Sequence, residues 1–272
     1  MAREQFSKIA YKTLQQGKSI AGLAHKEIST RIMNFMLPDN DLGNFNIDRK
    51  LLIDIQKSMD LLREEDWLDA EKNIYPIKLL FDEPWLRYLT QYPKILLDMP
   101  NTWDRRRKQN VQDLPKSVDK ENYPQYYLRN FHHQTDGYLS DFSASIYDLQ
   151  VEILFNGSAD AMRRRIIKPL KEGLKNFNNR RKSSLKILDV ATGSGRTLKQ
   201  LRGAFPKEKI MGLDLSGSYL KEASRYVSDL DGDLIELIKG NAEELPFEDN
   251  SLQGISCVFL FHELPRTIRE KV

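Results

Sequence analysis

The sequence has few of the features that mark secreted, membrane-spanning or nucleic-acid-binding chains. It contains a single cysteine, Cys257, so it has no intramolecular disulfide framework. The formal net charge is only +3, which argues against nucleic-acid binding driven by bulk positive charge. We identify neither a signal peptide nor an apolar run of transmembrane length. We therefore expect a soluble cytoplasmic protein that does not bind nucleic acid.

The chain is long enough for more than one folding unit. Its 272 residues are 40% hydrophobic and 30% charged, and single domains usually span about 100 to 200 residues. A polar stretch with a proline at 110–122 marks the main boundary. We expect three regions: a helical N-terminal domain at 1–110, a helical lid or linker at 111–180, and a ligand-binding α/β domain at 181–272.

The N-terminal region has the apolar spacing of helices. Apolar residues recur along 1–36 and 48–73, which predicts two amphipathic helices. Four prolines punctuate the aromatic-rich segment that follows and predict several short helices: Pro76, Pro84, Pro93 and Pro100. The basic run 103–110 is interpreted as a solvated helix face or loop, with binding of an anionic substrate or lipid head group as the alternative.

A glycine-rich turn between two predicted elements organises the C-terminal region. Residues 185–190 are apolar enough for a buried strand of a parallel sheet, and a helix is expected over 196–205. Gly193 and Gly195 lack a Cβ, so the backbone between these elements can turn sharply and approach a ligand closely. The free N–H groups at the helix start face the same turn, where α/β sheets usually bind nucleotide-like ligands.

Asp214 and Leu198 indicate which kind of nucleotide-like ligand the turn can bind. A second strand at 209–213 ends in Asp214, about 20 residues after the turn, where nucleotide-binding folds place a carboxylate for ribose hydroxyls. A dinucleotide fingerprint starting at Gly193 requires a small residue at position 198, beside the pyrophosphate. The sequence has Leu198 there, so the dinucleotide interpretation is rejected.

Four motifs resemble those of class I S-adenosylmethionine (SAM) dependent methyltransferases. DVATGSG at 189–195 resembles motif I, with Ala191 in place of the first glycine, a change that we expect the turn to tolerate. GLDLS, GNAEELPFEDNS and VFLFHELP follow in family order, and the second of these is similar to a segment of ubiquinone and menaquinone C-methyltransferases. Residues 123–272 also resemble uncharacterised methyltransferase-domain proteins of cyanobacteria and plastids, so the plastid stroma is the alternative location if the source is a photosynthetic eukaryote.

The resemblance implies SAM as the cofactor. By this resemblance Asp214 would bind the ribose and Tyr147 would lie near the methionine end of SAM. Asn241 replaces the family acid at the adenine, and its amide can both donate and accept hydrogen bonds. The implied cofactor-binding residues are Asp189, Ala191, Thr192, Gly193, Ser194, Gly195, Asp214, Leu215, Asn241, Ala242, Glu243, Tyr147 and Phe259.

The resemblance also implies an α/β fold, a Rossmann-like class I methyltransferase sheet after a mainly helical N-terminal domain. Four predicted strands would take the order 3-2-1-4: 185–190, 209–213, 233–239 and 254–261. The family sheet has seven strands, so we expect a truncated or incomplete form, with a partner that completes the sheet as the alternative. Residues 159–177 are predicted to form one helix, kinked at Pro169.

Side chains expected near the cofactor are candidates for substrate binding and proton transfer. Residues 123–155 combine aromatic rings, histidines and acids in a segment that would cover the cofactor as a lid. Its substrate-side candidates are His132, His133, Asp136 and Tyr138, with simple packing as the alternative. His262 follows the fourth strand and is the best-placed general base, and Glu263 would hold the methionine amino group or the acceptor. The predicted catalytic residues are His262, His133 and Tyr138.

The remaining features bound the function. No metal site is predicted, because the adjacent histidines lack i, i+4 spacing and have no cysteine nearby. We expect methyl transfer to a small-molecule acceptor, by analogy quinone-like or lipid-like. The alternatives are a non-catalytic SAM-fold binding or scaffold protein, an inactive truncated form, and a protein or RNA methyltransferase. The last is disfavoured because FHELP stands where amide and nucleobase methyltransferases commonly carry N/D-P-P-Y/F.

Overall fold

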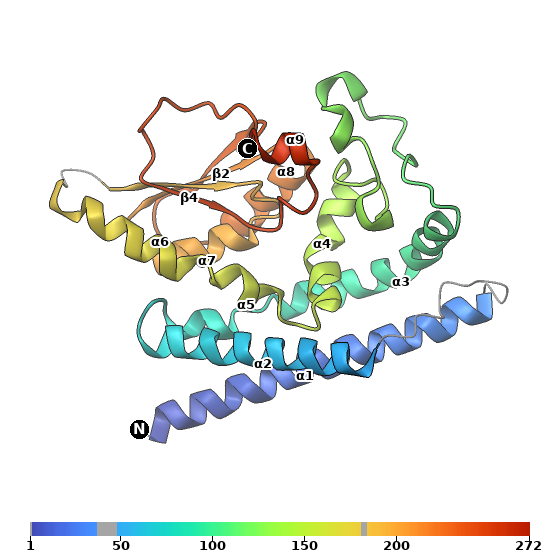
Figure 1. Cartoon of the computed structure of the whole chain (residues 1–272), viewed down its shortest axis with the longest axis horizontal. Helices are drawn as coiled ribbons and strands as arrows, with labels where there is room; N and C mark the ends of the chain where they lie inside the picture. Colours follow the sequence, from blue (N-terminus) through green and yellow to red (C-terminus); the bar gives the residue numbers. More distant parts are fainter. Residues whose placement is uncertain (1, 37–47, 181–183) are drawn as a thin grey trace. The chain divides into compact units, whose positions relative to one another are not determined.

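The chain folds into two compact units (Figure 1). The computed structural model describes three stretches: residues 2–36, 48–180 and 184–272. The first unit, here called the helical unit, comprises Met1–Gln109 and Leu149–Arg165. The second, here called the sheet unit, comprises Asn110–Asp148 and Ile166–Val272. The region 111–180, expected as one lid or linker, is thus shared between the units.

Two long helices begin the helical unit, as predicted. Helix α1 spans Ala2–Met36 and α2 spans Arg49–Glu71. The side chain of Asp48 caps α2, because its Oδ1 accepts a hydrogen bond from the backbone N of Lys50 at 3.0 Å. Across the described stretches, no helix combines the length and the apolar character that crossing a membrane requires.

The prediction of several short helices at the prolines is wrong for the second half of that segment. Pro76 and Pro84 do precede helices, η1 at Ile77–Phe81 and α3 at Trp85–Arg107. Pro93 and Pro100, however, lie inside α3. One face of α3 is buried, and this packing holds the helix together across the backbone hydrogen bonds that the prolines cannot make. The apolar residues on the buried face are Tyr88, Ile95, Met99 and Trp103.

A buried ion pair joins the return segment of the helical unit to its long helices. Arg164 ends α5, Ala159–Arg164, and donates from Nε and Nη2 to the two carboxylate oxygens of Asp66 at 2.8 and 2.7 Å. The hydroxyl groups of Tyr11 and Tyr75 also donate to Asp66, at 2.6 and 2.7 Å. The carboxylate is therefore saturated with donors in the core of this unit.

The single kinked helix predicted at 159–177 is instead two helices. Helix α5 ends at Arg164, and α6 begins the sheet unit at Ile167–Leu174. Pro169 lies in the first turn of α6, where its missing N–H would have no intrahelical partner, so it causes no kink there. A 3₁₀ segment, η5 at Lys175–Arg180, follows α6.

The sheet unit contains four parallel strands in the predicted order, β3-β2-β1-β4. Their bounds are Lys186–Val190 for β1, Lys209–Asp214 for β2, Glu236–Lys239 for β3 and Gly254–Cys257 for β4. The register sets Asp189 of β1 beside Gly212 of β2 and Ser256 of β4. Because all strands run the same way, their carboxyl ends form one edge, where the loops that carry the predicted motifs meet.

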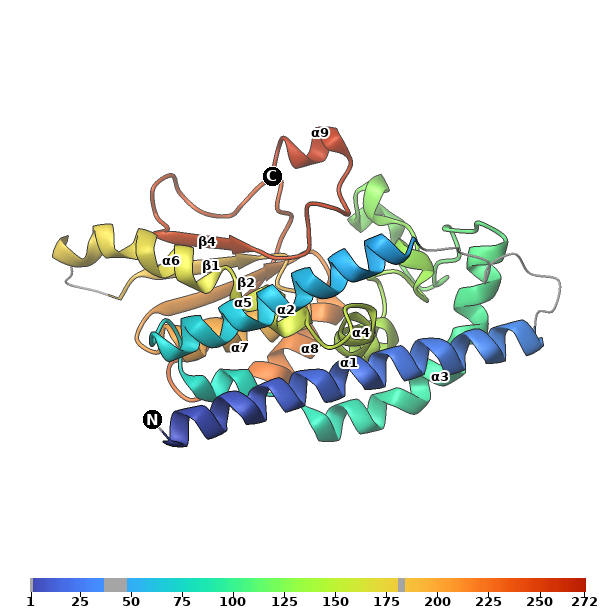
Figure 2. The ribbon, with the colours of Figure 1, turned by 60° about the horizontal axis from the view of Figure 1, so that its bottom comes forward.

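Different segments cover the two faces of the sheet (Figure 2). Helices α7, Arg196–Ala204, and α8, Gly217–Val227, pack beside each other on one face. The connection from β3 to β4 covers the other face. There Leu245, Phe247 and Leu252 pack against a buried cluster of strand residues: Leu188, Val190, Met211 and Leu213.

Two strands are shorter than predicted. The fourth was expected over 254–261, but β4 ends at Cys257. Phe259 has a φ of 61°, and an extended strand cannot include a residue in the left-handed region. The third was expected over 233–239, but β3 begins only at Glu236. The chain therefore turns early after β4, which places His262 and Glu263 in a loop rather than directly after a strand.

Within the sheet unit, short helical turns come before the strands in the sequence. They are η2 at Lys120–Asn122, η3 at Gln125–Tyr127 and η4 at Phe131–His133, followed by α4 at Asp141–Leu154. Buried Gln134 fixes this segment, since its Nε2 donates to the carbonyl of Gly137 at 2.6 Å and to the hydroxyl of Tyr219 at 3.1 Å. A short helix, α9, lies at Arg266–Arg269.

Candidate functional site

The glycine turn after β1 has the left-handed backbone that its sequence indicates. Ala191, Gly193 and Gly195 have φ angles of 55°, 57° and 86°. A Cβ on Gly195 would lie 3.1 Å from the Cβ of Ala223 in α8, so glycine also permits close helix packing here. Among the described residues other than its chain neighbours, a Cβ on Gly193 would meet no atom nearer than 3.9 Å, in the ring of Tyr219. The Gly193 side of the turn is therefore open to a ligand.

Ala191 occupies the one motif position where this chain departs from the family glycine. Its φ of 55° lies in the region that glycine adopts without penalty. A Cβ in this conformation costs about 1 to 2 kcal/mol. The turn thus accommodates alanine, as expected, but the substitution carries backbone strain.

Asp189 braces the base of the turn. It is 1% exposed. One oxygen accepts from the hydroxyl of Thr192 at 2.8 Å and the other from the hydroxyl of Ser256 at 2.6 Å. The backbone N of Thr192 donates to the carbonyl of Leu213 at 3.0 Å. These hydrogen bonds fix the turn to β4 and β2. Asp189 therefore holds the turn in position beneath the place where the cofactor is predicted to bind.

Asp214 faces the glycine turn from the end of β2. Its two oxygens accept from the backbone N–H groups of Gly193 and Ser216, each at 2.8 Å. A further backbone hydrogen bond comes from Leu215, another predicted cofactor residue. Burial raises the pKa of Asp214 to about 6, although these N–H groups oppose that shift. The carboxylate of Asp214 therefore lies against the glycine turn. In the described part of the chain, no cationic side chain lies beside it.

Ser194 connects the glycine turn to α4. Its hydroxyl donates to the Oδ1 of Asp148 at 2.5 Å, and both side chains are buried. Ser216 makes a comparable contact with the preceding segment, because its hydroxyl donates to the carbonyl of Tyr138 at 2.6 Å. The segment 123–148 is therefore fixed against both the β1 and the β2 ends of the site.

The predicted adenine residues form a polar group after β3. Asn241 accepts from the backbone N of Glu243 at 3.1 Å and donates to its carboxylate at 3.2 Å. Tyr126 donates to the same carboxylate at 2.8 Å, and this hydrogen bond lowers the pKa of Glu243. Ala242, predicted to contact the adenine, packs against the apolar cluster of β1 and β2. The amide of Asn241 is thus held in one orientation by its neighbour.

Aromatic rings from three segments form a continuous cluster near Asp214. Tyr138 contacts Phe131 at 5.0 Å, Tyr147 at 5.9 Å and Tyr219 at 5.5 Å between ring centroids. Tyr147 and Tyr219 also contact each other at 5.5 Å. Tyr127 adjoins the cluster through Tyr138 at 6.1 Å, and burial with the charge of Asp214 raises its pKa. This cluster supplies an apolar wall beside the glycine turn.

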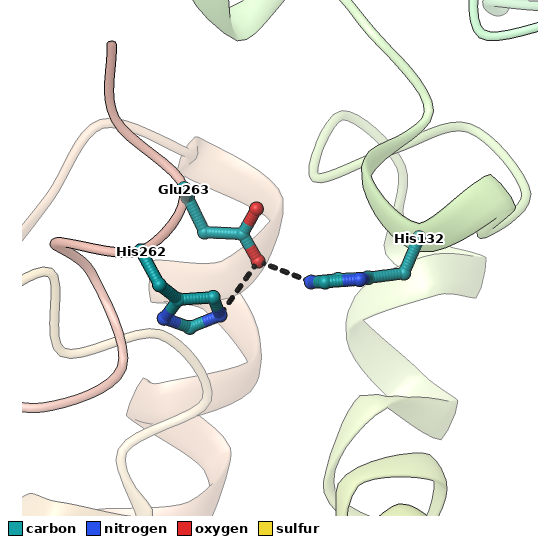
Figure 3. A group of neighbouring side chains, drawn as sticks. All are labelled: His132, His262 and Glu263. Atoms are coloured by element: carbon teal, nitrogen blue, oxygen red, sulfur yellow. Dashed lines mark hydrogen bonds and ion pairs between the residues drawn. The ribbon is translucent and has the colours of Figure 1, made fainter. Parts of the chain in front are cut away.

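Two histidines from distant parts of the chain converge on Glu263 (Figure 3). The Nε2 atoms of His132 and His262 lie 2.7 and 3.1 Å from its Oε1. The hydroxyl of Tyr138 donates to the same oxygen at 3.1 Å. We call His132, His262 and Glu263 the histidine–glutamate cluster. The hydrogen bond to Glu263 raises the pKa of His132. Burial would raise the pKa of Glu263, but its contacts with His132, His262 and Tyr138 lower it overall.

The structure brings together some predicted substrate-side residues and separates others. His262 and Tyr138 both reach Glu263. Among the described residues, the third side chain that reaches Glu263 is that of His132, whereas the prediction was His133. His132 and His133 both have left-handed φ angles, 52° and 59°. The directions of their side chains could therefore not be predicted from the sequence.

Several residues of the site escaped prediction because they carry no motif. Tyr219 lies in α8, and its hydroxyl bonds to Ser143 at 2.9 Å and to Gln134 at 3.1 Å. Tyr126 and Tyr127 belong to the aromatic segment but were not singled out within it. The one usable signal was the position of Tyr219, three residues after the helix cap Ser216, which turns its side chain back toward the site.

The sheet unit is an α/β fold with the strand order of class I methyltransferases. The family model described as "Methyltransferase domain" matches residues 187–272. These residues are therefore similar to this family, and their parallel sheet has the strand order of the Rossmann-like methyltransferase fold.

Curated proteins similar to this chain are named as methyltransferases. The chain is 33% identical over 135 residues to a demethylmenaquinone methyltransferase of Thermotoga maritima, covering 48% of this chain and 53% of the relative. It is 36% identical over 85 residues to a demethylmenaquinone methyltransferase of Bacillus cereus, covering 31% of this chain and 36% of the relative. The chain thus spans about half the length of the first relative, and less of the second. Among solved structures, a putative methyltransferase from Bacillus halodurans is 27% identical, with a TM-score of 0.26 over 32% of this chain and 36% of that one.

Proposed function

We propose that this chain binds SAM and transfers its methyl group to a small quinone-like or lipid-like acceptor. The observation that carries the proposal is the position of Asp214 opposite the open Gly193 side of the turn. In the described part of the chain this buried carboxylate is held by backbone N–H groups, which leave acceptor capacity for a ribose hydroxyl. The names of the relatives, demethylmenaquinone methyltransferases, support a quinol as the acceptor class.

The residues present fit a nucleoside with an amino-acid tail. Asp214 would bind the ribose, and the oriented amide of Asn241 would bind the adenine edge. Gly193, which has room around its Cβ position, would let the backbone approach the tail closely. The rings of Tyr138, Tyr147 and Tyr219 would exclude water and face the positive sulfonium, an arrangement that cation–π attraction favours.

Methyl transfer depends mainly on alignment of donor and acceptor. When bound, SAM supplies an electrophilic methyl group on a sulfonium sulfur. The polypeptide contributes a fixed turn, braced by Asp189 and Ser194, that would hold the donor in one orientation. A quinol ring carbon that gains a methyl group must lose its proton. His262 would accept this proton, with Glu263 orienting its ring and stabilising its charge.

The proposal is tested by transfer of radiolabelled methyl from SAM to a reduced demethylmenaquinone with a short side chain. We expect labelled product with the full chain and roughly 100-fold slower transfer with His262→Gln, because general-base catalysis contributes about 100- to 10,000-fold. SAM affinity should be unchanged in this variant. Glu270→Gln, which alters an exposed ion pair with Arg266, is the control.

Two outcomes would count against the proposal. A folded chain that binds SAM but methylates no quinol would favour a binding or scaffold protein. Product formation that is equal in His262→Gln and in the unchanged chain would remove His262 from proton transfer and leave positioning as the mechanism.

A further inference from the structure

The histidine–glutamate cluster has a donor set that resembles a metal site more than a simple hydrogen-bonded pair. It joins two imidazole nitrogens and one carboxylate oxygen from η4 and from the loop after β4. The three ligand atoms all lie within 4.8 Å of one another. Figure 3 shows both rings directed at the same oxygen of Glu263. Two neutral imidazoles with one carboxylate are a common ligand set for Zn²⁺ and Fe²⁺.

The spacing of the cluster is close to what a tetrahedral ion requires. Metal–ligand bonds of about 2.0 to 2.2 Å place neighbouring ligand atoms roughly 3.3 Å apart around such an ion. Here the two histidine nitrogens lie 2.7 and 3.1 Å from the glutamate oxygen. Both nitrogen–oxygen distances are thus slightly shorter than this separation, and the two nitrogens lie within 4.8 Å of each other.

The backbone presents His132 to the cluster in an unusual conformation. His132 and His133 have φ angles of 52° and 59°, and each such residue costs about 1 to 3 kcal/mol. Buried Asn130 holds this turn in place. Its side chain accepts from the backbone N of Asp113 at 2.8 Å and donates to the carbonyls of Asp113 and Gln134 at 2.8 and 3.0 Å. Because Asn130 maintains this strained backbone, we infer that the direction of the His132 side chain toward Glu263 has a function.

Exposure and an outer partner complete the resemblance to a metal site. The side chains of His132 and His262 are 60% and 53% exposed, so an ion can reach them from solvent. Glu263 is 11% exposed and accepts a hydrogen bond from Tyr138, which orients its carboxylate as outer partners orient metal ligands. With three protein ligands, a tetrahedral ion keeps one position open.

A second acidic cluster, in the helical unit, lacks these properties. Glu83, Glu152 and Asp160 also lie close enough together for an ion. Lys18 already bonds to both glutamates, and Arg163 bonds to Asp160 at 2.8 Å. Cationic side chains therefore neutralise that cluster, whereas the histidine–glutamate cluster carries imidazoles that a metal prefers.

We propose that His132, His262 and Glu263 bind one divalent transition-metal ion, of which Zn²⁺ fits the donor set best, with one coordination position left open. Binding would cross-link η4 to the loop after β4. If the proposed methyl transfer also holds, a bound ion would replace the contact between the Nε2 of His262 and Glu263 and make the His262 ring a weaker base, so ion binding would slow transfer.

The test measures ion binding without SAM, so it is independent of the proposed function. Co²⁺ is titrated into the full, tag-free chain after removal of metals by a chelator, and the visible bands of bound Co²⁺ are followed. We expect one ion per chain, displaced by Zn²⁺. His132→Ala and His262→Ala should each weaken binding by at least roughly 100-fold, the upper range for loss of outer partners alone. Both histidines are largely exposed, so these variants should fold.

Two controls decide whether any binding belongs to this cluster. His25→Ala removes a histidine of the helical unit that bonds to Tyr92, and it should leave Co²⁺ affinity unchanged. Cys257→Ser removes the single thiol and should also leave it unchanged. The proposal is overturned if no saturable binding of one ion occurs. It is equally overturned if His132→Ala and His262→Ala bind Co²⁺ as tightly as the unchanged chain.

Discussion

The helical unit and the sheet unit each bury an aspartate, and they hold the two carboxylates in opposite ways. Asp66 is 0% exposed and Asp214 is 8% exposed. Asp66 receives two nitrogens of Arg164 and two tyrosine hydroxyls. Asp214 receives backbone N–H groups, and no cation bonds to it in the described part of the chain.

The pKa values of these carboxyl groups follow from this difference. Burial would raise both. For Asp66, the charge and hydrogen bonds of Arg164 outweigh burial and lower the pKa. For Asp214, burial prevails and raises the pKa to about 6. A neutralised carboxylate fixes a core, whereas a buried carboxylate without a cation is suited to bind donors of a ligand.

The largest expected effect comes from breaking the neutralised pair. Arg164→Met should lower the free energy of unfolding by about 3 to 5 kcal/mol, because it leaves Asp66 buried without its cation. Urea unfolding followed by tryptophan fluorescence measures this effect. All three tryptophans report on the helical unit: Trp67, Trp85 and Trp103.

An exposed ion pair supplies the control for Arg164→Met. Arg31 and Glu27 pair at 2.8 Å with side chains 78% and 63% exposed. Arg31→Ala should change the unfolding free energy by less than about 0.5 kcal/mol. Similar small changes in both variants would show that the buried pair does not stabilise the helical unit.

The pH dependence of stability should have opposite signs for the two aspartates. The folded pKa of Asp214 is raised, so its stabilising contribution is present below the unfolded pKa and is lost as pH rises through about 6. A shift from the model-compound value of 3.8 to about 6 corresponds to about 3 kcal/mol. The folded pKa of Asp66 is lowered, so its contribution is present above the unfolded pKa and is lost as pH falls.

The contribution of Asp214 is measured by comparing the free energies of unfolding of Asp214→Asn and the unchanged chain at several pH values from about 4 to about 7. The unchanged chain should lose stability relative to Asp214→Asn as pH rises. Asp249→Asn, at an exposed loop position, should parallel the unchanged chain. Parallel curves for all three proteins would mean that the pKa of Asp214 is not raised.

The smallest expected effect concerns the strained alanine of the sheet unit. Ala191→Gly removes a cost of about 1 to 2 kcal/mol for the left-handed conformation, but glycine loses about 0.5 to 1 kcal/mol more chain entropy on folding. The net expectation is a gain of about 0.5 to 1 kcal/mol in the free energy of unfolding, measured by urea unfolding followed by circular dichroism.

The matched control exchanges the same residues in the reverse direction. At Gly217, where an added Cβ would meet no atom of the described residues beyond its neighbours within 4 Å, Gly217→Ala should stabilise by about 0.4 to 1 kcal/mol. Destabilisation by Ala191→Gly would show that Ala191 is not strained.

The sheet and its turn were predictable because local sequence determines them. The apolar run of β1, the two glycines and Asp214 specify strand, turn and strand end within about 30 residues, and the observed strand order matches. The helices were less predictable. Pro93 and Pro100 lie inside α3, because burial of one helix face outweighs the local effect of proline.

The substrate side of the site depends on contacts that local sequence does not encode. His132 and Glu263 are 131 residues apart in the chain, and a left-handed turn decides which histidine faces the glutamate. The prediction of no metal site rested on the spacing of the adjacent histidines within one segment. It could not anticipate His262 and Glu263, which a different loop supplies.

The most direct test of the account is calorimetric titration of SAM into the full chain and into Asp214→Asn, with Asp249→Asn as the control. If Asp214 binds the ribose, the substitution should weaken SAM binding by roughly 1.5 to 3 kcal/mol, or about 10- to 150-fold, while the control binds normally. Equal affinity in Asp214→Asn, or no binding by the folded chain, would contradict the assignment of this carboxylate to the cofactor.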